Sequence, residues 1–424
     1  MRKTRKAVLF APLLVTAFLM CPALGDVATP LVIDALYISR ALGPLHRNHL
    51  EADPCVSIHF VPMPGHYTVH DLGMDASMLN RWMRMYMPRS YEDLVGHYDL
   101  VILHEAPVSL AQIPEIRFDT KWMSWFVRAV VDEGRSLTMW HGDASWGAGL
   151  EGPWLYGSWG ETMLDQILPF ECFGGEQATW YGRFRPQFLD SEHPLARLPW
   201  EPDLLLEEMK KVRPKLGATE IARTVEVGIG GATYPWIAWW RTGKGKVLGE
   251  AAGAWENDFV LRPWIMWGWY QDFLIYLAYL AADKPLPSDI YLVHRLREDV
   301  NGYIAKVGLA VSVLDFAEKF GANTVALRAE LEQIGSVKKT AENHYRMNEY
   351  EETGRLLQEV HSALDRISTK AVEIKDRALF WVYLAEWLVV TGACLISGFV
   401  LWSLMVRRRL YREVVTTRGK EEAG

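Results

Sequence analysis

Cysteine is scarce in this chain of 424 residues, which contains only 4. That number excludes the small disulfide-rich scaffolds, which rely on a framework of bridges in place of a large core. Cys21 and Cys394 fall within long apolar segments, so Cys55 and Cys172 remain as the only other pair. The sequence leaves open whether these two form one disulfide or stay as free, buried thiols.

Two further features are missing. The glycosylation signal Asn-x-Ser/Thr does not occur, and no basic patch accompanies the formal net charge of −7. Nucleic-acid binding depends on clustered lysine and arginine, so DNA and RNA are excluded as expected partners. The sequence also gives no reason to expect a cofactor, and none is predicted.

A long apolar run is present near the C-terminus, at residues 387–406, and it ends at three consecutive arginines, residues 407–409. At about 1.5 Å per residue the run matches a hydrocarbon core about 30 Å thick. Aromatic residues lie near both ends, as in membrane-interface belts; they are Trp381, Tyr383, Trp387 and Trp402. We predict a transmembrane helix with a cytoplasmic C-terminus; the alternative is a buried helix of a soluble protein.

The N-terminus fits the same orientation. Four basic residues among the first six precede an apolar stretch at residues 7–20, and Ala23-Leu24-Gly25 follows. This pattern predicts a cleavable secretory signal, with residues from Asp26 onward exported. An uncleaved anchor and a lipoprotein signal at Cys21 are the alternatives.

A second apolar stretch, residues 264–281, must be judged before the topology is set. Gln271 and Asp272 lie at its centre, and a central Asp costs about 2.5 to 3.5 kcal/mol on insertion scales. A second span would also place the arginines of residues 407–409 outside. We therefore interpret this stretch as a helix that closes a folded domain.

The region between the signal and that helix has an α/β pattern. Short apolar runs suit strands buried on both faces, and a helical pattern around residues 122–133 separates two of them. The strand–helix–strand order indicates right-handed crossovers and a parallel sheet. A turn at residues 242–245 joins two later strands. The predicted strands cover residues 31–38, 56–63, 98–104, 137–140, 232–241 and 246–250.

Residues 31–287 carry a series of phrases in a characteristic order. They read YDLVIL at 98–103, FVRAVVDEG at 126–134, WGET at 159–162, ILP at 167–169, EHPL at 192–195, PWI at 235–237 and GKGKV at 243–247. In this order the chain resembles the glutamine-amidotransferase-like domains of the class I amidotransferase superfamily. The resemblance implies a flavodoxin-like parallel sheet flanked by helices.

The resemblance does not extend to the activity. A class I amidotransferase needs a cysteine on a tight, glycine-flanked strand-to-helix turn, together with a later His and Glu. Where that turn is expected, residues 140–147 read WHGDASWG, and the late strand ends in GEAAG at residues 249–253 without a histidine. We therefore predict that the domain does not hydrolyse glutamine.

Polar residues nevertheless gather where two neighbouring predicted strands end, which is where open α/β sheets bind ligands. His104 and Glu105 end one strand. The residues after the next strand are His141, Asp143, Ser145 and Trp146. These six are the candidate ligand-binding residues, and no catalytic residue is assigned.

Several chemistries fit these candidates. Two imidazoles and two carboxylates would suit zinc or a similar ion, so the metal is left undetermined. Ser145 with His141 would suggest a hydrolase, but the glycine frame of a nucleophile elbow is absent. The structural alternative is that His141 and Asp143 bond loop backbone and cap the next helix.

Tryptophan is abundant, with 19 residues, and only Trp381, Trp387 and Trp402 follow residue 288. Several crowd the segments just after the candidate strand. Aromatic faces in a cleft bind sugars or cations, whereas buried tryptophans fill a core. We interpret them, and the group at residues 264–269, as packing.

The pattern beyond Pro287 is helical, with breaks expected near Gly321 and Gly335. One apolar stripe follows residues 300, 304, 307, 311 and 314, and another follows residues 357, 360, 364, 367, 371 and 374. Such stripes indicate long helices that pack on each other within one chain or between chains.

The predicted organisation has five parts. They are a signal peptide (1–25), an amidotransferase-like ectodomain (26–287), a helical hairpin or coiled stalk (288–377), a juxtamembrane segment with the transmembrane helix (378–406), and a basic cytoplasmic tail (407–424). We expect a type I, single-pass membrane protein with a non-catalytic binding or scaffolding domain. The alternatives are an exported hydrolase or metal-dependent enzyme and an accessory subunit that contacts a membrane partner or itself through the stalk.

Overall fold

The computed structural model describes residues 30–40, 44–63, 76–106, 108–110, 113–142, 145–147, 157–173, 179–228, 230–253 and 263–421. The predicted signal peptide lies outside these residues. The chain divides into two compact units. The first extends to Ile290 and includes Asn343–Glu349, which is the end of one helix and the turn after it, and the second comprises Tyr291–Glu342 and Tyr350–Gly424.

The first unit is built on a ten-stranded sheet with the order β14-β9-β8-β11-β12-β13-β6-β3-β1-β2. Its strands are β1 (Ile33–Arg40), β2 (Val56–Met63), β3 (Leu100–His104), β6 (Ser136–Trp140), β8 (Thr179–Phe188), β9 (Leu206–Lys210), β11 (Thr219–Glu226), β12 (Thr233–Thr242), β13 (Gly245–Glu250) and β14 (Ala252–Gly253). Two small sheets pair β4 (Ser109–Leu110) with β5 (Ile113–Arg117) and β7 (Phe170–Cys172) with β10 (Val212–Pro214).

One half of the large sheet is parallel. Strand β1 pairs with β2 and β3, β3 with β6, and β6 with β13, all in parallel. Numbered among themselves these strands follow the order 2-1-3-4-5, a common order of doubly wound α/β sheets. The four strands predicted from apolar runs before residue 141 are confirmed, with small shifts at their ends.

The predicted parallel sheet is thus present, and the other half of the large sheet is antiparallel. The hairpin of β12 and β13 is confirmed, and its turn needs Gly243 because φ is +59° there. Strands β8, β9 and β11 were not predicted. Strand β9 pairs with β14, which directly follows β13 along the chain, and the Lys210 amide donates to the Ala251 carbonyl at 2.8 Å. Strand β9, near the far edge of the antiparallel half, therefore lies beside the segment that follows β13.

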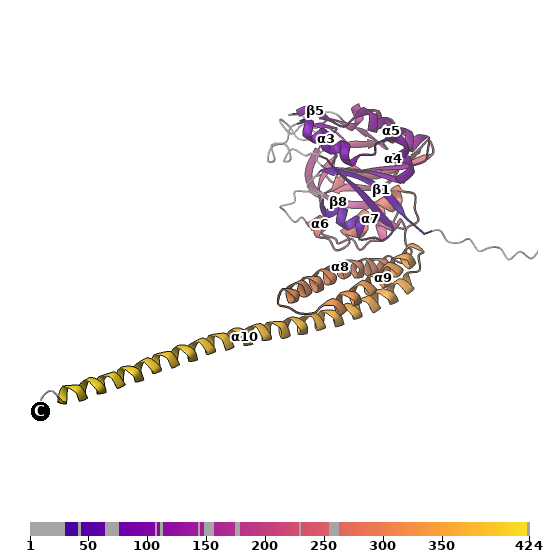
Figure 1. Cartoon of the computed structure of the whole chain (residues 1–424). Helices are drawn as coiled ribbons and strands as arrows, with labels where there is room; N and C mark the ends of the chain where they lie inside the picture. Colours follow the sequence, from indigo (N-terminus) through magenta and orange to yellow (C-terminus); the bar gives the residue numbers. More distant parts are fainter. Residues whose placement is uncertain are drawn as a thin grey trace, which may run out of the picture. The chain divides into compact units, whose positions relative to one another are not determined.

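Helices cover both faces of the parallel half (Figure 1). On one face α3 (Ala76–Tyr86), α4 (Tyr91–His97) and α5 (Thr120–Val131) join the main apolar core. A capping box at Ser90 starts α4, and the Asp119 side chain caps α5. The helix pattern predicted around residues 122–133 is thereby confirmed.

The opposite face carries α1 (Pro44–Glu51) and α7 (Tyr270–Ala281), which contact each other; α7 also contacts β6 and β13. The short α6 (Pro263–Met266) precedes α7. Nearly all of α7 is buried, including Asp272 at 1% exposure. The stretch at residues 264–281 is therefore a core element of the α/β unit, as predicted.

The second unit consists of α8 (Ile290–Lys319), α9 (Val325–Arg346) and α10 (Tyr350–Glu421). The three helices lie side by side, and α10 continues well beyond the other two (Figure 1). The stripe on α10 is buried from Leu357 to Ala371 and packs against α8 and α9 of the same chain. The stripe predicted on α8 was partly wrong, because Ile304 is 61% exposed.

The break predicted at Gly321 is confirmed, since α8 ends there and φ is +81°. The break predicted at Gly335 was wrong. Gly335 lies within α9, and a Cβ added at this position would lie 3.6 Å from the Tyr303 hydroxyl. The chain instead turns between α9 and α10 at Asn348, whose φ is +61°.

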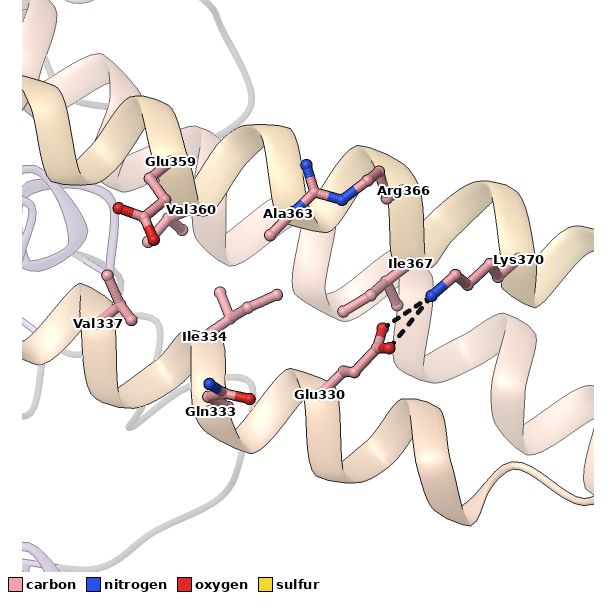
Figure 2. A pocket seen from close by; sticks show the side chains of 10 residues that line it. All are labelled: Glu330, Gln333, Ile334, Val337, Glu359, Val360, Ala363, Arg366, Ile367 and Lys370. Atoms are coloured by element: carbon pink, nitrogen blue, oxygen red, sulfur yellow. Dashed lines mark hydrogen bonds and ion pairs between the residues drawn. The ribbon is translucent and has the colours of Figure 1, made fainter.

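A groove runs between α9 and α10 (Figure 2). Its volume is about 290 Å³, and Ile334, Val360 and Ile367 contribute apolar side chains to its lining. The Lys370 ammonium bridges the groove to Glu330 at 3.1 Å.

By length and composition alone, α8 and α10 could each cross a membrane. In each helix the apolar window is an 18-residue stretch of high hydropathy. Within the protein, 22% of the apolar window of α8 is buried and 0% of that of α10.

Candidate functional site

Three neighbouring parallel strands end along one edge of the sheet, called here the carboxyl edge. Strand β3 ends at His104, β6 at Trp140 and β13 at Glu250. The register places His104 opposite Trp140. The carboxyl edge therefore brings together Glu105, His141 and Glu250, each at or just after the end of its strand.

His104 belongs to a buried aromatic network on the face covered by α1 and α7. Its Nδ1 is 2.7 Å from the Tyr37 hydroxyl, and the His46 ring meets it edge-on at 4.6 Å. His46 Nε2 in turn lies 2.8 Å from the Tyr270 hydroxyl. The imidazole is only 3% exposed, so in this arrangement it joins the sheet to the two helices.

Glu105 follows His104 in a left-handed conformation, with φ of +50°, which is rare for a residue with a side chain. It is buried and packs on Gly142, whose own φ is +155°. A Cβ at position 142 would overlap the Glu105 side chain. A glycine directly after His141 thus allows the ends of β3 and β6 to approach.

His141 is also buried and lies among charged groups. Its backbone amide donates to Glu250 Oε2 at 2.7 Å, and its Nε2 is 3.6 Å from Glu208 Oε1. Burial lowers the pKa of the imidazole, but the negative charges of Glu208 and Glu250 outweigh burial and raise the pKa above its ordinary value. Protonated His141 is thus favoured as a partner for Glu208.

Glu208 and Lys210 complete this group, and the sequence did not reveal them. They alternate along β9 and so share one face of that strand, both are 0% exposed, and Lys210 Nζ lies 3.4 Å from Glu208 Oε1. Glu250 Oε1 accepts from the Trp236 indole at 2.7 Å. We call His141, Glu208, Lys210 and Glu250 the buried charge cluster.

Close packing surrounds the cluster. A Cβ at Gly253 would lie 2.7 Å from His141 Nδ1, so glycine is needed where β14 passes the imidazole. Since β14 pairs with β9, the same contact holds Glu208 against His141.

Ser145 and Trp146 lie next to this cluster. The Ser145 amide donates to the Gly142 carbonyl at 2.9 Å, and its Oγ is buried without a hydrogen-bond partner among the described residues. Trp146 is fully buried with φ of +66°, and its indole donates to the Glu250 carbonyl at 2.9 Å. Asp143, the sixth candidate, lies outside the described residues.

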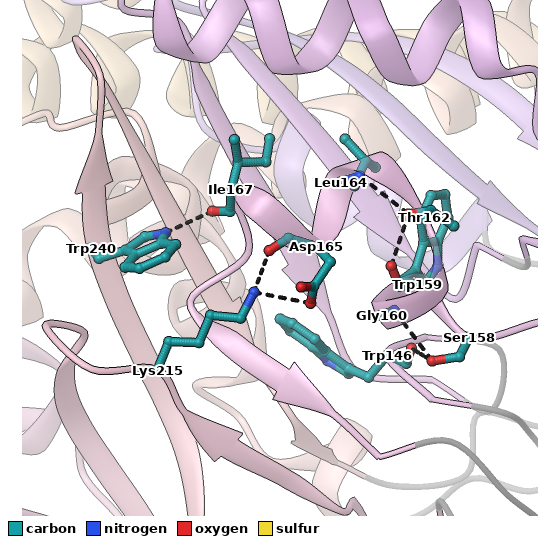
Figure 3. Close-up of polar contacts among 10 residues, drawn as sticks. All are labelled: Trp146, Ser158, Trp159, Gly160, Thr162, Leu164, Asp165, Ile167, Lys215 and Trp240. Carbon is teal, nitrogen blue, oxygen red and sulfur yellow. Dashed lines mark hydrogen bonds and ion pairs between the residues drawn. The ribbon is translucent and has the colours of Figure 1, made fainter.

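The segment that follows is tied down by backbone and side-chain hydrogen bonds (Figure 3). The Trp159 amide donates to the Trp146 carbonyl, and the hydroxyls of Ser158 and Thr162 cap two short 3₁₀ helices, Trp159–Glu161 and Met163–Gln166. The Lys215 ammonium then pairs with Asp165 at 2.9 Å. These contacts fix the segment that packs next to Trp146 at the carboxyl edge.

The predicted role of the tryptophans as packing is confirmed for most of the described ones. Trp140, Trp146 and Trp159 are at most 1% exposed, whereas Trp180 is 41% exposed. Trp154 lies outside the described residues. In the later group, Trp264 and Trp267 stack with each other at 5.8 Å, and Trp200 stacks on Trp267 at 4.5 Å.

The candidate residues that the structure describes do not converge as one metal site. His104 faces Tyr37 and His46, while His141 faces the buried charge cluster. Among the described residues no three His, Cys, Asp or Glu side chains are arranged to hold a metal ion.

Cys55 and Cys172 are not joined by a disulfide, so the disulfide alternative is not formed. Cys55 lies just before β2, at the amino end of a parallel strand. Cys172 lies in β7, where burial, followed by the charge of Asp165, raises the pKa of its thiol to about 12. Neither occupies the carboxyl edge as a reactive thiolate.

The sequence matches no protein-family profile and no curated protein. Solved structures with a similar arrangement include two cytoplasmic proteins of Salmonella typhimurium. They are 11% and 14% identical, with TM-scores of 0.42 and 0.43, and each likeness covers 59% of this chain and 99% of the other. A ThuA-like protein from Parabacteroides merdae is 14% identical with a TM-score of 0.39, over 61% of this chain and 94% of the other.

Proposed function

We propose that this chain is a single-pass membrane protein whose α/β unit is an exported, non-catalytic binding or scaffolding domain of the amidotransferase-like, flavodoxin-like type. Helix α10 anchors it with the C-terminus in the cytoplasm. The main support for this membrane anchor is the exposure of α10, because its apolar window has a mean hydropathy of 2.1 and is 0% buried. Arginines at residues 407–409 follow that window, as the positive-inside rule requires of a cytoplasmic end.

Helix α8 does not offer an equivalent anchor. Its window is less apolar, at 1.3, and its buried residues pack in the bundle with α9 and α10. A helix that packs this way in an aqueous bundle needs no bilayer to cover it. We therefore propose a single membrane span, formed by α10, and assign α8 to the helical bundle.

The absence of catalysis is supported by the chemistry of the carboxyl edge. The described thiols lie elsewhere, and the buried charge cluster pairs internally: Glu250 accepts from Trp236 and from the His141 amide, and Glu208 pairs with both His141 and Lys210. Groups that are engaged and enclosed in this way stabilise the fold rather than act on a substrate.

Backbone strain supports ligand binding at the same edge. Glu105 and Trp146 both have positive φ, and residues held in such conformations cluster at binding and active sites. Each costs of order 1 to 3 kcal/mol, which a purely structural edge would not need.

A second candidate function, an exported hydrolase, is favoured by one observation. The Ser145 hydroxyl is buried without a hydrogen-bond partner among the described residues, and it follows His141 closely in the chain. Such a hydroxyl would serve as a nucleophile if an imidazole took its proton.

Two experiments test the proposal. Full-length protein purified gently from native membranes should carry a stoichiometric partner, identified by mass spectrometry. The same preparation should show no turnover of glutamine or of model amides and esters. Turnover that is lost in both His141→Ala and Ser145→Ala would contradict the proposal and establish the hydrolase instead.

A further inference from the structure

The tip of the hairpin between α8 and α9 exposes apolar side chains. Phe316, Phe320 and Val325 are 41%, 38% and 73% exposed, and the two phenylalanine rings contact each other at 4.9 Å. We call these three residues the hairpin tip. Exposed apolar side chains that are grouped in this way mark surfaces that contact a protein or a membrane.

The backbone of this turn is well defined. The Gly321 amide donates to the Glu318 carbonyl, and the Ala322 amide donates to the Ala317 carbonyl. With φ of +81° at Gly321, these two bonds form a Schellman motif that ends α8. The motif therefore ends α8 next to Phe320.

The acidic side chains next to the tip share one arginine partner. The Arg328 guanidinium pairs with both Asp315 and Glu318, and Glu318 also accepts from the Thr324 hydroxyl. Lys319, the basic residue of the last turn of α8, stands beside Phe320. Arg328 and Lys319 together carry two positive charges, which balance the two carboxylates, so this end of the hairpin has no net negative charge to repel anionic headgroups.

The position of the tip along α10 follows from contacts within the bundle. Helices α8 and α10 run in parallel: Lys306 pairs with Asp365 at a sequence separation of 59, and Leu314 packs with Ala371. Since both helices rise about 1.5 Å per residue, the same offset sets Phe320 at about the level of residue 379 of α10.

At that level α10 begins its own exposed aromatic band. Phe380, Trp381 and Tyr383 are 59%, 61% and 64% exposed, and the predicted span follows. Trp and Tyr gather where a helix enters the headgroup region, which adds several ångströms to each side of the hydrocarbon core. The hairpin tip and this band therefore face the same layer.

We propose that the hairpin tip is a second membrane contact, in the headgroup layer beside α10. This inference rests on the proposed span of α10. Two contacts at one level would hold the bundle at a defined tilt and stop it from rotating about a single helix. The occupant of this apolar surface is lipid, because its level coincides with the aromatic band of the anchoring helix.

Depth-dependent fluorescence quenching tests the proposal in the full-length chain. Its four cysteines are first replaced, and the variants are placed one copy per nanodisc of phosphatidylcholine with some phosphatidylglycerol. Phe320→Cys carries an environment-sensitive fluorophore, and nitroxides are placed on the lipid headgroup or on the acyl chain. We expect a blue-shifted emission and loss of fluorescence with shallow nitroxides. Val325→Cys is the second tip variant, in case the first disturbs folding.

The matched control is Leu309→Cys, which is also exposed on α8, at 64%, but lies farther from the tip. It should be neither shifted nor quenched. Native Cys394 alone, exposed on α10 within the predicted span, tests that span through deep acyl-chain nitroxides.

The outcomes separate the two claims. Quenching of Cys394 without quenching at either tip position would overturn this inference and leave the span intact. An unquenched Cys394 would overturn both. Tip signals that change only with two copies per disc would assign the surface to a second copy of the chain and overturn lipid contact.

Discussion

The carboxyl edge of the α/β unit and the three-helix unit use their side chains in opposite ways. At the edge, Glu208 and Lys210 are 0% exposed although charged, whereas in the helical unit Phe320 and Trp381 are exposed although apolar. Charges in the interior need partners inside the protein, while apolar groups outside need partners beyond it. The buried charges of the carboxyl edge therefore stabilise the fold, whereas the exposed apolar groups of the helical unit contact the surroundings.

The largest expected effect comes from breaking the buried charge cluster. Glu208→Ala removes the partner of both His141 and Lys210, and breaking a buried pair costs about 3 to 5 kcal/mol. Urea unfolding of the full chain in detergent, followed by tryptophan fluorescence, reports mainly the α/β unit, which holds most of the tryptophans. Glu192→Ala is the control, since its pair with Arg197 is exposed and should contribute within about 1 kcal/mol. Equal effects of the two variants would contradict internal pairing.

The helical unit should be sensitive to cavities instead. Leu364 is 0% exposed in the stripe of α10, and Leu364→Ala should destabilise the bundle by about 2 to 5 kcal/mol. Hydrogen exchange of the α9 and α10 amides measures this locally. Leu309→Ala, on the exposed face of α8, should stay within about 0.5 kcal/mol; a comparable loss there would mean that another part of the protein covers that face.

A smaller, pH-dependent effect is expected from His141. Its pKa is raised in the folded protein, so its pairing with Glu208 stabilises fully below the ordinary value of about 6.5 and is lost as pH rises through the folded pKa. The stability difference between the parent and His141→Gln, measured by urea unfolding from pH 5 to 9, should shrink with rising pH. A difference that stays constant would show that His141 does not pair as a cation.

The smallest effect should come from the rim of the helical groove. Lys370→Ala removes the exposed pair with Glu330 and should cost about 0.2 to 1 kcal/mol at low salt. Hydrogen exchange of the α9 amides at low and high salt should show this difference fading, because salt screens exposed charges. A cost that persists in high salt would point to a packing role for the lysine stem.

The parallel half of the sheet was predictable from the sequence because its strands are buried on both faces and read as apolar runs. Strand β8 escaped this criterion, since Arg183 and Arg185 flank the aromatic Phe184 and the strand contains Pro186, a residue that argues against a strand in sequence. Strands with one polar face give a weaker local signal than doubly buried ones.

The candidate site was predicted only in part. His141, Ser145 and Trp146 do lie beside one another near the end of β6, because the end of a parallel strand follows from the sequence. Glu208 and Lys210 could not be predicted, since charged residues are expected at the surface and their partner His141 is distant in sequence. Two features of the sequence could have pointed to the buried charge cluster. One is Gly253, which allows the close approach to His141, and the other is the alternation of Glu208 and Lys210 along one strand.

Thiol labelling of right-side-out membrane vesicles tests the central claim of an exported α/β unit anchored by α10 most directly. Three variants each keep one cysteine: Glu192→Cys in the α/β unit, native Cys394, and Arg408→Cys after the apolar window. A membrane-impermeant maleimide should label Glu192→Cys at once, Arg408→Cys only after the vesicles are opened, and Cys394 only after detergent. Labelling of Arg408→Cys in sealed vesicles, or protection of Glu192→Cys, would contradict the account.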